Sequence, residues 1–274
     1  MNFFSKETNK GNWMRVTSWT TIVYMVFIGL PIFALVLRGL GSQQLINNIF
    51  SDLTLQALRL SFITSSISIL AIVLFATPTA YYLSRKAGNL KRMIEILIDL
   101  PIVLPPVVAG VAMLMAFGRN GLLSNLFGNT EYSVSFTTLA VILAQIFVAA
   151  PFYTKSASNG FAQVPRELED ISQTLGMTPI KTFWKITLPI ASPTILGGLA
   201  LSWARALSEF GATLMFAGNF IGKTQTMPLA ILSAMETDFD AAIALSILLL
   251  IASTVILVIL TMLGQRSNSV EVRE

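Results

Sequence analysis

The sequence predicts an all-α integral membrane protein with six transmembrane helices, and three observations support this fold class. Hydrophobic residues make up 54% of the 274 residues and charged residues only 12%, against roughly a quarter in soluble domains. Basic residues also concentrate in alternate connections between apolar stretches. Six stretches of at least 19 residues contain no Asp, Glu, Lys or Arg. A helix needs roughly 20 apolar residues to span a membrane, so each stretch is long enough or nearly so. The stretches are Val16–Leu37, Leu60–Ser84, Leu100–Gly118, Tyr132–Thr154, Ile186–Ala204 and Ala241–Gln265.

These stretches predict six spans within a single transmembrane domain, residues 1–274. The first is longer than the apolar region of a signal peptide and lacks a small-residue cleavage site, so we expect it to remain as an anchor. Ser61, Ser65, Ser66 and Ser68 in the second span suit close helix packing. The loop 216–240 is expected to be re-entrant or to lie on the outer surface. The spans are residues 17–38, 56–84, 94–117, 135–155, 189–214 and 241–264.

The third and fifth predicted spans contain candidate pathway residues. Pro105 and Pro106 remove backbone donors and bend the third span, either as a harmless kink or to shape a pathway. Arg205 and Glu209 lie four residues apart on one predicted helix face and can pair. The pair could brace the fifth helix or line a pathway, and bracing is favoured because a strong fixed anion site would hinder release. Phe210 and Thr213 follow on the same span.

The placement of Lys and Arg predicts the topology. With the N-terminus inside, thirteen of the eighteen basic residues fall in cytoplasmic segments, so both termini are predicted to be cytoplasmic. The net charge of +4 follows from this bias and indicates no nucleic-acid partner. The cytoplasmic basic residues are Lys6, Lys10, Arg15, Arg85, Lys86, Lys91, Arg92, Lys155, Arg166, Lys181, Lys185, Arg266 and Arg273.

The cytoplasmic loop 156–188, between the fourth and fifth spans, is long and has the pattern of two short helices. Pro165 suits a first helical position and Gly176 a helix end, with Leu168, Ile171 and Leu175 forming one apolar stripe between them. Thr178 and Pro179 begin a second helix. So short a helix is marginal alone, and its three acids and one base argue against a lipid-surface helix. We therefore expect a protein partner.

This loop resembles the EAA loop of ATP-binding-cassette importer permeases. The family pattern is Glu-Ala-Ala, three residues, Gly, nine residues, Ile-x-Leu-Pro. Here Asp170-Ile171-Ser172 replaces Glu-Ala-Ala, whereas Gly176 and Ile186-Thr187-Leu188-Pro189 match fully, spacing included. The resemblance implies that the helix couples the permease to an ATPase. The residues it assigns to coupling are Pro165, Glu169, Asp170, Ile171, Leu175, Gly176, Ile186, Leu188 and Pro189.

The resemblance covers most of residues 55–264 and implies a substrate class. DLPIVLPPVVAG followed by FGRNG (Phe117–Gly121) is similar to the third span of molybdate-type permeases. So is ARALSEFGATLMFAGN (Ala204–Asn219) with KTQTMPLAI (Lys223–Ile231), although sulfate permeases share its Arg-Ala-Leu-x-Glu core. Molybdate or tungstate is therefore the first expectation. Sulfate or thiosulfate is the second.

The resemblance also implies the partners: a second copy of the chain, two cytoplasmic ATPase subunits and an extracytoplasmic oxyanion-binding protein, in a prokaryotic cell membrane. The chain has no Gly-x-x-x-x-Gly-Lys-Ser/Thr loop, so we expect the partner ATPase to bind ATP and magnesium. We expect no enzyme activity and no cofactor in this chain. An ion-coupled carrier would need titratable groups near mid-membrane, where only Arg205 and Glu209 qualify. A redox-enzyme anchor and a metal site are disfavoured because the chain lacks histidine and cysteine.

Overall fold

The computed structural model describes residues 5–126 and 133–271, which are all-helical in their regular structure. Tyr132, which begins the fourth uncharged stretch, and Arg273 of the tail lie outside these ranges. The elements are α1 (Ser5–Leu40), α2 (Leu45–Ile49), α3 (Asp52–Arg85), α4 (Asn89–Val103), α5 (Pro106–Phe117), α6 (Leu122–Leu126), α7 (Thr138–Gln163), α8 (Arg166–Thr174), α9 (Pro179–Thr182), the π-helix η1 (Phe183–Thr187), α10 (Leu188–Leu207), α11 (Gly211–Ala217), α12 (Met227–Thr237) and α13 (Phe239–Glu271).

Six segments of the described chain are long and apolar enough to cross a membrane, which confirms the predicted fold class. They differ from the expected spans mainly at the third, which begins at Pro106 instead of residue 94, and at the fifth, which covers Pro179–Leu207 instead of residues 189–214. The predicted outer loop 216–240 contains the short helix α12. The six segments are Thr17–Leu40, Asp52–Arg85, Pro106–Ser124, Thr138–Gln163, Pro179–Leu207 and Phe239–Gly264.

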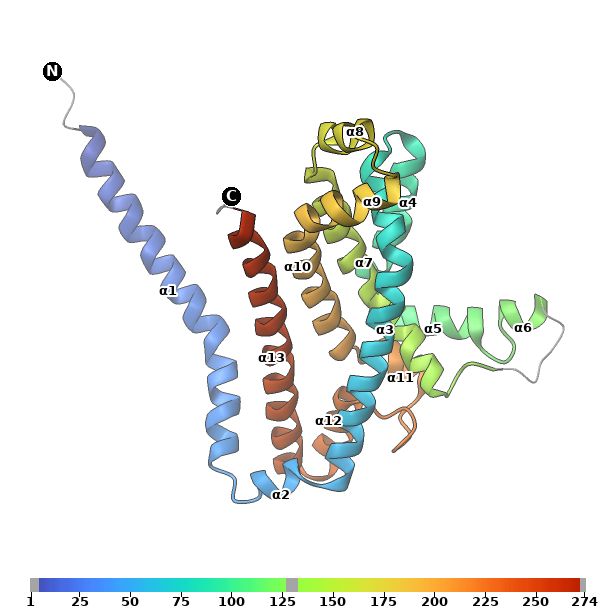
Figure 1. The fold of residues 1–274 in the computed structure, drawn as a ribbon. Helices are drawn as coiled ribbons and strands as arrows, with labels where there is room; N and C mark the ends of the chain where they lie inside the picture. Colours follow the sequence, from blue (N-terminus) through green and yellow to red (C-terminus); the bar gives the residue numbers. More distant parts are fainter. Residues whose placement is uncertain (1–4, 127–132, 272–274) are drawn as a thin grey trace.

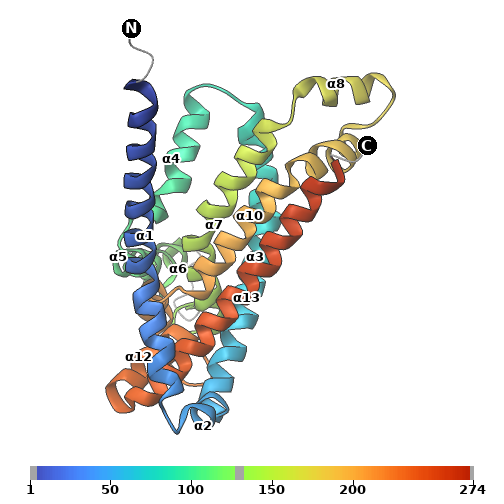
Figure 2. The same cartoon turned by 90° about the vertical axis from the view of Figure 1, so that its left-hand side faces the viewer.

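The long helices α3, α7, α10 and α13 form a bundle in which α7 contacts both α3 and α10 (Figure 1). Helix α1 stands apart from this bundle along most of its length and approaches α13 near its own C-terminal end (Figure 1). Figure 2 shows that α8 lies at the end of the molecule where α1 begins and α13 finishes, whereas α2 and α12 lie at the opposite end. The bundle thus has two distinct ends, and α8 shares one of them with both chain termini.

The centre of the bundle is built from small and polar residues that let the helices approach closely. Ala149, Ala157 and Gly160 of α7 are buried among side chains of α3 and α10. Hydrogen bonds cross between helices, from Ser202 Oγ to the Ala149 carbonyl at 2.8 Å and from Trp203 Nε1 to Ser65 Oγ at 3.0 Å. Small residues and interhelical hydrogen bonds are the usual means of helix association in bilayers, because burial of apolar surface contributes little to association there.

The serines of the second predicted span take part in this packing. Ser61, Ser65 and Ser68 are buried, and Ser66 is partly buried. Ser61 Oγ accepts a hydrogen bond from the Met227 amide at 2.7 Å, and Ser68 Oγ donates to Gln145 Oε1 at 3.0 Å. These contacts tie α3 to α12 and to α7.

The third and fifth predicted spans are each divided into two helices in the structure. Helix α4 ends at Val103, and extended backbone at Leu104 and Pro105 separates it from α5. Two successive prolines remove two amide donors, which produces a break where we predicted a bend. Helix α10 ends at Leu207, and α11 begins only at Gly211.

The adjacent glycines of α10 give a direct test of the α7–α10 contact. A Cβ added at Gly198 would overlap the Cβ of Ser156, whereas one added at Gly197 would meet nothing within 4 Å. We expect Gly198→Ala to lower the free energy of unfolding by about 1–3 kcal/mol through overpacking. Gly197→Ala should be neutral or slightly stabilising, since alanine is the better helix former. Thermal unfolding in detergent measures both, and equal melting temperatures for the two variants would contradict this packing.

Candidate functional site

Helix α8 projects beyond the bundle and ends where the sequence indicates (Figure 2). Pro165 is its N-cap, whereas we predicted this proline at the first helical position, so the helix begins one residue later than expected, at Arg166. At the other end Gly176 has φ +88°, and the Met177 amide donates to the Ser172 carbonyl at 3.0 Å. A left-handed glycine after the last turn is a common helix terminator, so the predicted end is confirmed. Thr178 then caps α9, accepting from the Lys181 amide, with Pro179 in the first turn.

The apolar stripe of α8 faces away from the rest of the chain. Leu168 is 40% exposed, Ile171 57% and Leu175 80%. Ile180 and Trp184, on α9 and η1, add further exposed apolar surface at this end of the bundle. Ile180 and Trp184 belong to the fifth candidate membrane segment, Pro179–Leu207, whereas the stripe of α8 lies between the fourth and fifth segments. Exposed apolar surface outside such a segment marks a site of interaction with another molecule.

The opposite face of α8 is polar and is turned into the chain itself. Glu169 is buried, and its Oε1 atom lies 2.6 Å from both Arg85 Nη2 and Thr187 Oγ1, which donate to it. Ser172, also buried, shares a hydrogen bond of 2.7 Å with Thr182. Glu169, which we expected among the coupling residues, therefore does not lie on the exposed face, whereas its neighbour Asp170, which aligns with the Glu of the family pattern, does.

The Ile-x-Leu-Pro segment lies at the start of the fifth membrane segment. Ile186 is in η1, Leu188 begins α10, and Pro189 follows in the first turn. Leu188 packs against the buried cluster shared by α3, α7 and α10. The π-helix continues into α10 without a break, so this segment connects α9 directly to the membrane bundle.

The two helix breaks pack against each other within the apolar region. A Cβ built on Gly211, at the start of α11, would lie 2.6 Å from the Cβ of Pro106, at the start of α5. One built on Gly110 would lie 2.6 Å from the Cβ of Met215. The contact between α5 and α11 therefore depends on glycine at both positions. Phe210 is 36% exposed beside the break, whereas Thr213 is buried.

Arg205 and Glu209 connect the two halves of the fifth span. Arg205 Nη2 lies 2.8 Å from Glu209 Oε2, and Glu209 Oε1 accepts from the Ala212 amide at 2.9 Å. The helix does not run through Glu209 as predicted, yet the pair forms across its end. A cation at the end of α10 and a carboxylate at the start of α11 both complement the helix dipoles. The geometry favours the bracing interpretation, because Oε1 of the buried Glu209 accepts from the Ala212 amide and Oε2 has Arg205 as its ion-pair partner.

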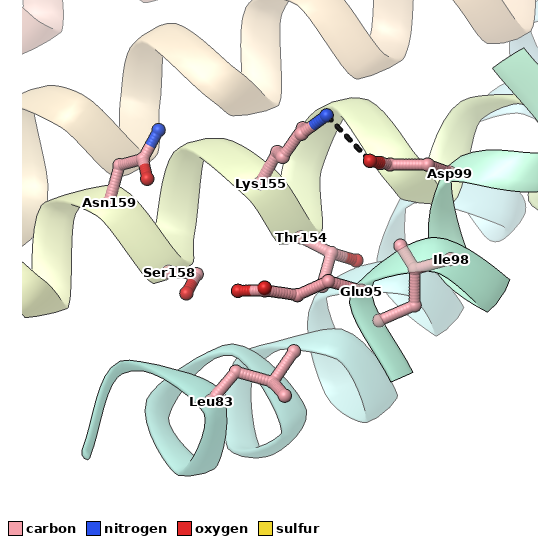
Figure 3. A pocket seen from close by; sticks show the side chains of 8 residues that line it. All are labelled: Leu83, Glu95, Ile98, Asp99, Thr154, Lys155, Ser158 and Asn159. Carbon is pink, nitrogen blue, oxygen red and sulfur yellow. Dashed lines mark hydrogen bonds and ion pairs between the residues drawn. The ribbon is translucent and has the colours of Figure 1, made fainter. Parts of the chain in front are cut away.

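A pocket of about 200 Å³ lies where α3, α4 and α7 meet. Figure 3 shows Lys155 of α7 extending to Asp99 of α4, with Nζ and Oδ2 2.8 Å apart, and Glu95 pointing towards Ser158. Two carboxylates and one ammonium group line the pocket, so its walls favour cations over anions. In this conformation the pocket does not suit an oxyanion.

A family model described as "Binding-protein-dependent transport system inner membrane component" matches residues 72–269. This range contains α8, both helix breaks and the Arg205–Glu209 pair. The chain belongs to this family. As a permease of ATP-binding-cassette transporters it is a multi-pass inner-membrane protein, is not itself an ATPase and carries no cofactor. Permeases of this family pair with ATPases and binding proteins.

Individual relatives agree with the permease assignment. The molybdenum transport system permease protein ModB of Mycobacterium tuberculosis is 40% identical over 86% of this chain and 89% of its own length. The sulfate transport system permease protein CysW of Synechococcus elongatus is 33% identical over 83% of this chain and 80% of its own length. A chain of a bacterial alginate transporter, solved with its periplasmic protein, superimposes with a TM-score of 0.75 at 18% identity, covering 96% of this chain and 97% of that one. The structural match concerns the fold alone.

The permease's Glu209 gives a prediction that follows from its burial. Glu209→Ala should lower the free energy of unfolding by about 3–5 kcal/mol, because it leaves a partly buried guanidinium and the Ala212 amide without their acceptor. Glu209→Gln should cost less, since an amide oxygen can still accept from Ala212. Unfolding of both variants in detergent provides the measurement. Equal losses would show that the cap to α11 does not contribute.

Proposed function

We propose that two copies of this permease form the transmembrane pathway of an ATP-driven importer for molybdate or tungstate. The substrate proposal is supported by the 40% identity to a protein named for molybdenum transport. The 33% identity to a sulfate permease makes sulfate or thiosulfate the second candidate. An ion-coupled carrier is disfavoured, because the family assignment indicates a binding-protein-dependent system.

The exposed apolar stripe of α8 is the observation that carries the coupling proposal. Leu168, Ile171 and Leu175 would enter a groove on the ATPase, as an amphipathic helix does in other complexes. The exposed acids Glu167 and Asp170 beside the stripe would meet basic residues at the rim of that groove. ATPase closure would then displace α8.

This proposal also fixes the orientation of the permease. The start of α1 and the finish of α13 lie at the same end as α8 (Figure 2), so an ATPase bound there places both termini in the cytoplasm. The concentration of Lys and Arg in the same segments supports this orientation. The binding protein would then dock at the opposite end, near α2 and α12.

We propose that the paired helix breaks line the pathway. Irregular backbone inside a bilayer is tolerated only where protein or water hydrogen-bonds to its free N–H and C=O groups. The breaks between α4 and α5 and between α10 and α11 therefore favour a protein interface or an aqueous route there. Partly exposed Arg205 and Phe210 would face this route, while Glu209 lowers the positive charge that an oxyanion meets. Weak attraction of this kind suits passage better than tight binding does.

Aspartate substitutions on α8 test the docking stripe. Ile171→Asp and Leu175→Asp should each weaken ATPase binding about 10- to 100-fold, since burial of such a side chain contributes about 1.5–3 kcal/mol. Gln173→Asp adds the same charge on another exposed face and is the matched control. Affinity between the purified permease and its ATPase in detergent is the measurement. Tight binding by both stripe variants would refute docking through α8.

Uptake into proteoliposomes tests the substrate. The permease, reconstituted with its ATPase and binding protein, should accumulate molybdate or tungstate with a preference over sulfate of at least about tenfold, or 1.4 kcal/mol. Omitting ATP is the control. Sulfate uptake without response to molybdate would overturn the substrate proposal and leave the docking proposal standing.

A further inference from the structure

A mostly buried ion pair beneath α8, between Arg85 and Glu169, has no role in the function proposed so far. Arg85 is the last residue of α3, and its side chain is 15% exposed, while that of Glu169 is 10% exposed. Arg85 Nη1 also donates to the Val164 carbonyl at 3.2 Å, and Arg166 Nη2 donates to the Arg85 carbonyl at 2.8 Å. A charged group is seldom buried away from water without a specific partner, because burial of the charge is costly.

The pair connects three parts of the chain that are distant in sequence. The single atom Glu169 Oε1 accepts both from Arg85, at the end of α3, and from Thr187, at the junction of η1 and α10. Arg85 also lies over the ring of Tyr81, which packs edge-on against Phe161 and Phe183. One carboxylate oxygen therefore joins the docking helix to two membrane-spanning helices.

Apart from the contacts of Glu169, two side-chain hydrogen bonds attach helix α8 to the rest of the chain, one between Ser172 and Thr182 and one from Arg166 to the Arg85 carbonyl. Its apolar side chains face outwards, and its two buried residues, Glu169 and Ser172, are both polar. The chain on one side is extended at Val164 and Pro165, and on the other it turns at Gly176. Short charge-assisted hydrogen bonds are directional, so this network holds the orientation of α8 as well as its position.

We propose that Arg85, Glu169 and Thr187 form a clamp that makes α8 move as one body with the cytoplasmic ends of α3 and α10. This inference rests on the proposed docking of an ATPase on the stripe. The stripe binds the ATPase, and the clamp transmits the displacement of α8 to the membrane helices α3 and α10. Without the clamp, α8 follows the ATPase while α3 and α10 stay behind. The three residues are therefore positioning residues, and their loss uncouples hydrolysis from transport while docking persists.

The test measures three quantities on the reconstituted complex: ATPase affinity, ATP hydrolysis, and oxyanion taken up per ATP hydrolysed. Glu169→Gln should keep ATPase affinity within about twofold of wild type and reduce uptake per ATP about tenfold, within the usual range of coupling between sites. Gln173→Glu makes the reverse change, from an amide to a carboxylate, on an exposed residue of the same helix outside the stripe, and it should leave the ratio unchanged. The double variant Arg85→Glu with Glu169→Arg should regain part of the lost ratio.

Thr187→Val provides a milder variant in case Glu169→Gln fails to insert. It removes one donor to Glu169 Oε1 while keeping the side-chain shape, and it should lower uptake per ATP in the same direction. An unchanged ratio in both variants would overturn the clamp. Loss of ATPase affinity in Glu169→Gln, as expected for Ile171→Asp, would also overturn it and assign Glu169 to docking. Failure of the wild-type permease to bind any ATPase through α8 would instead refute the proposed function.

Discussion

The close approach of α7 to both α3 and α10 is the constraint on which the rest of the structure depends. The hydrophobic effect contributes little to helix association in lipid, so the helices associate through close packing. Here small residues such as Gly198, Ala149 and Ala157 allow that packing. Because α3 and α10 are held against the same helix, their ends also lie close together. Arg85 and Thr187 therefore reach one carboxylate oxygen, and α8 is fixed above the bundle.

Local sequence pattern predicted much of this fold. Spans were visible because uncharged stretches of sufficient length are rare outside membranes, and the boundaries of α8 and α9 followed from Gly176, Thr178 and Pro179. The apolar stripe of α8 was also found from its helical spacing. In each case a residue and its near neighbours in the chain carry the information, so sequence alone was sufficient.

Features that depend on distant contacts were missed. No proline or glycine at Leu207 signals that α10 ends there. The helix end depends instead on the Glu209 side chain and on the contact of Gly211 with Pro106. Arg85 and Glu169 are 84 residues apart, so no local spacing points to their ion pair. We expected both Glu169 and Asp170 among the coupling residues, but only the fold shows that Glu169 faces inwards while Asp170 faces out.

The outward-facing stripe also has a consequence for how the cell must make this protein. In the proposed arrangement, a permease synthesised in excess of its ATPase would display Leu175 and Ile171 to the cytosol, where exposed apolar side chains invite aggregation and attract chaperones and proteases. Surplus copies would be short-lived, and matched production of the two subunits would set how many transporters accumulate. The stripe proposed to dock the ATPase would thus also mark an unassembled permease for degradation until the ATPase covers it.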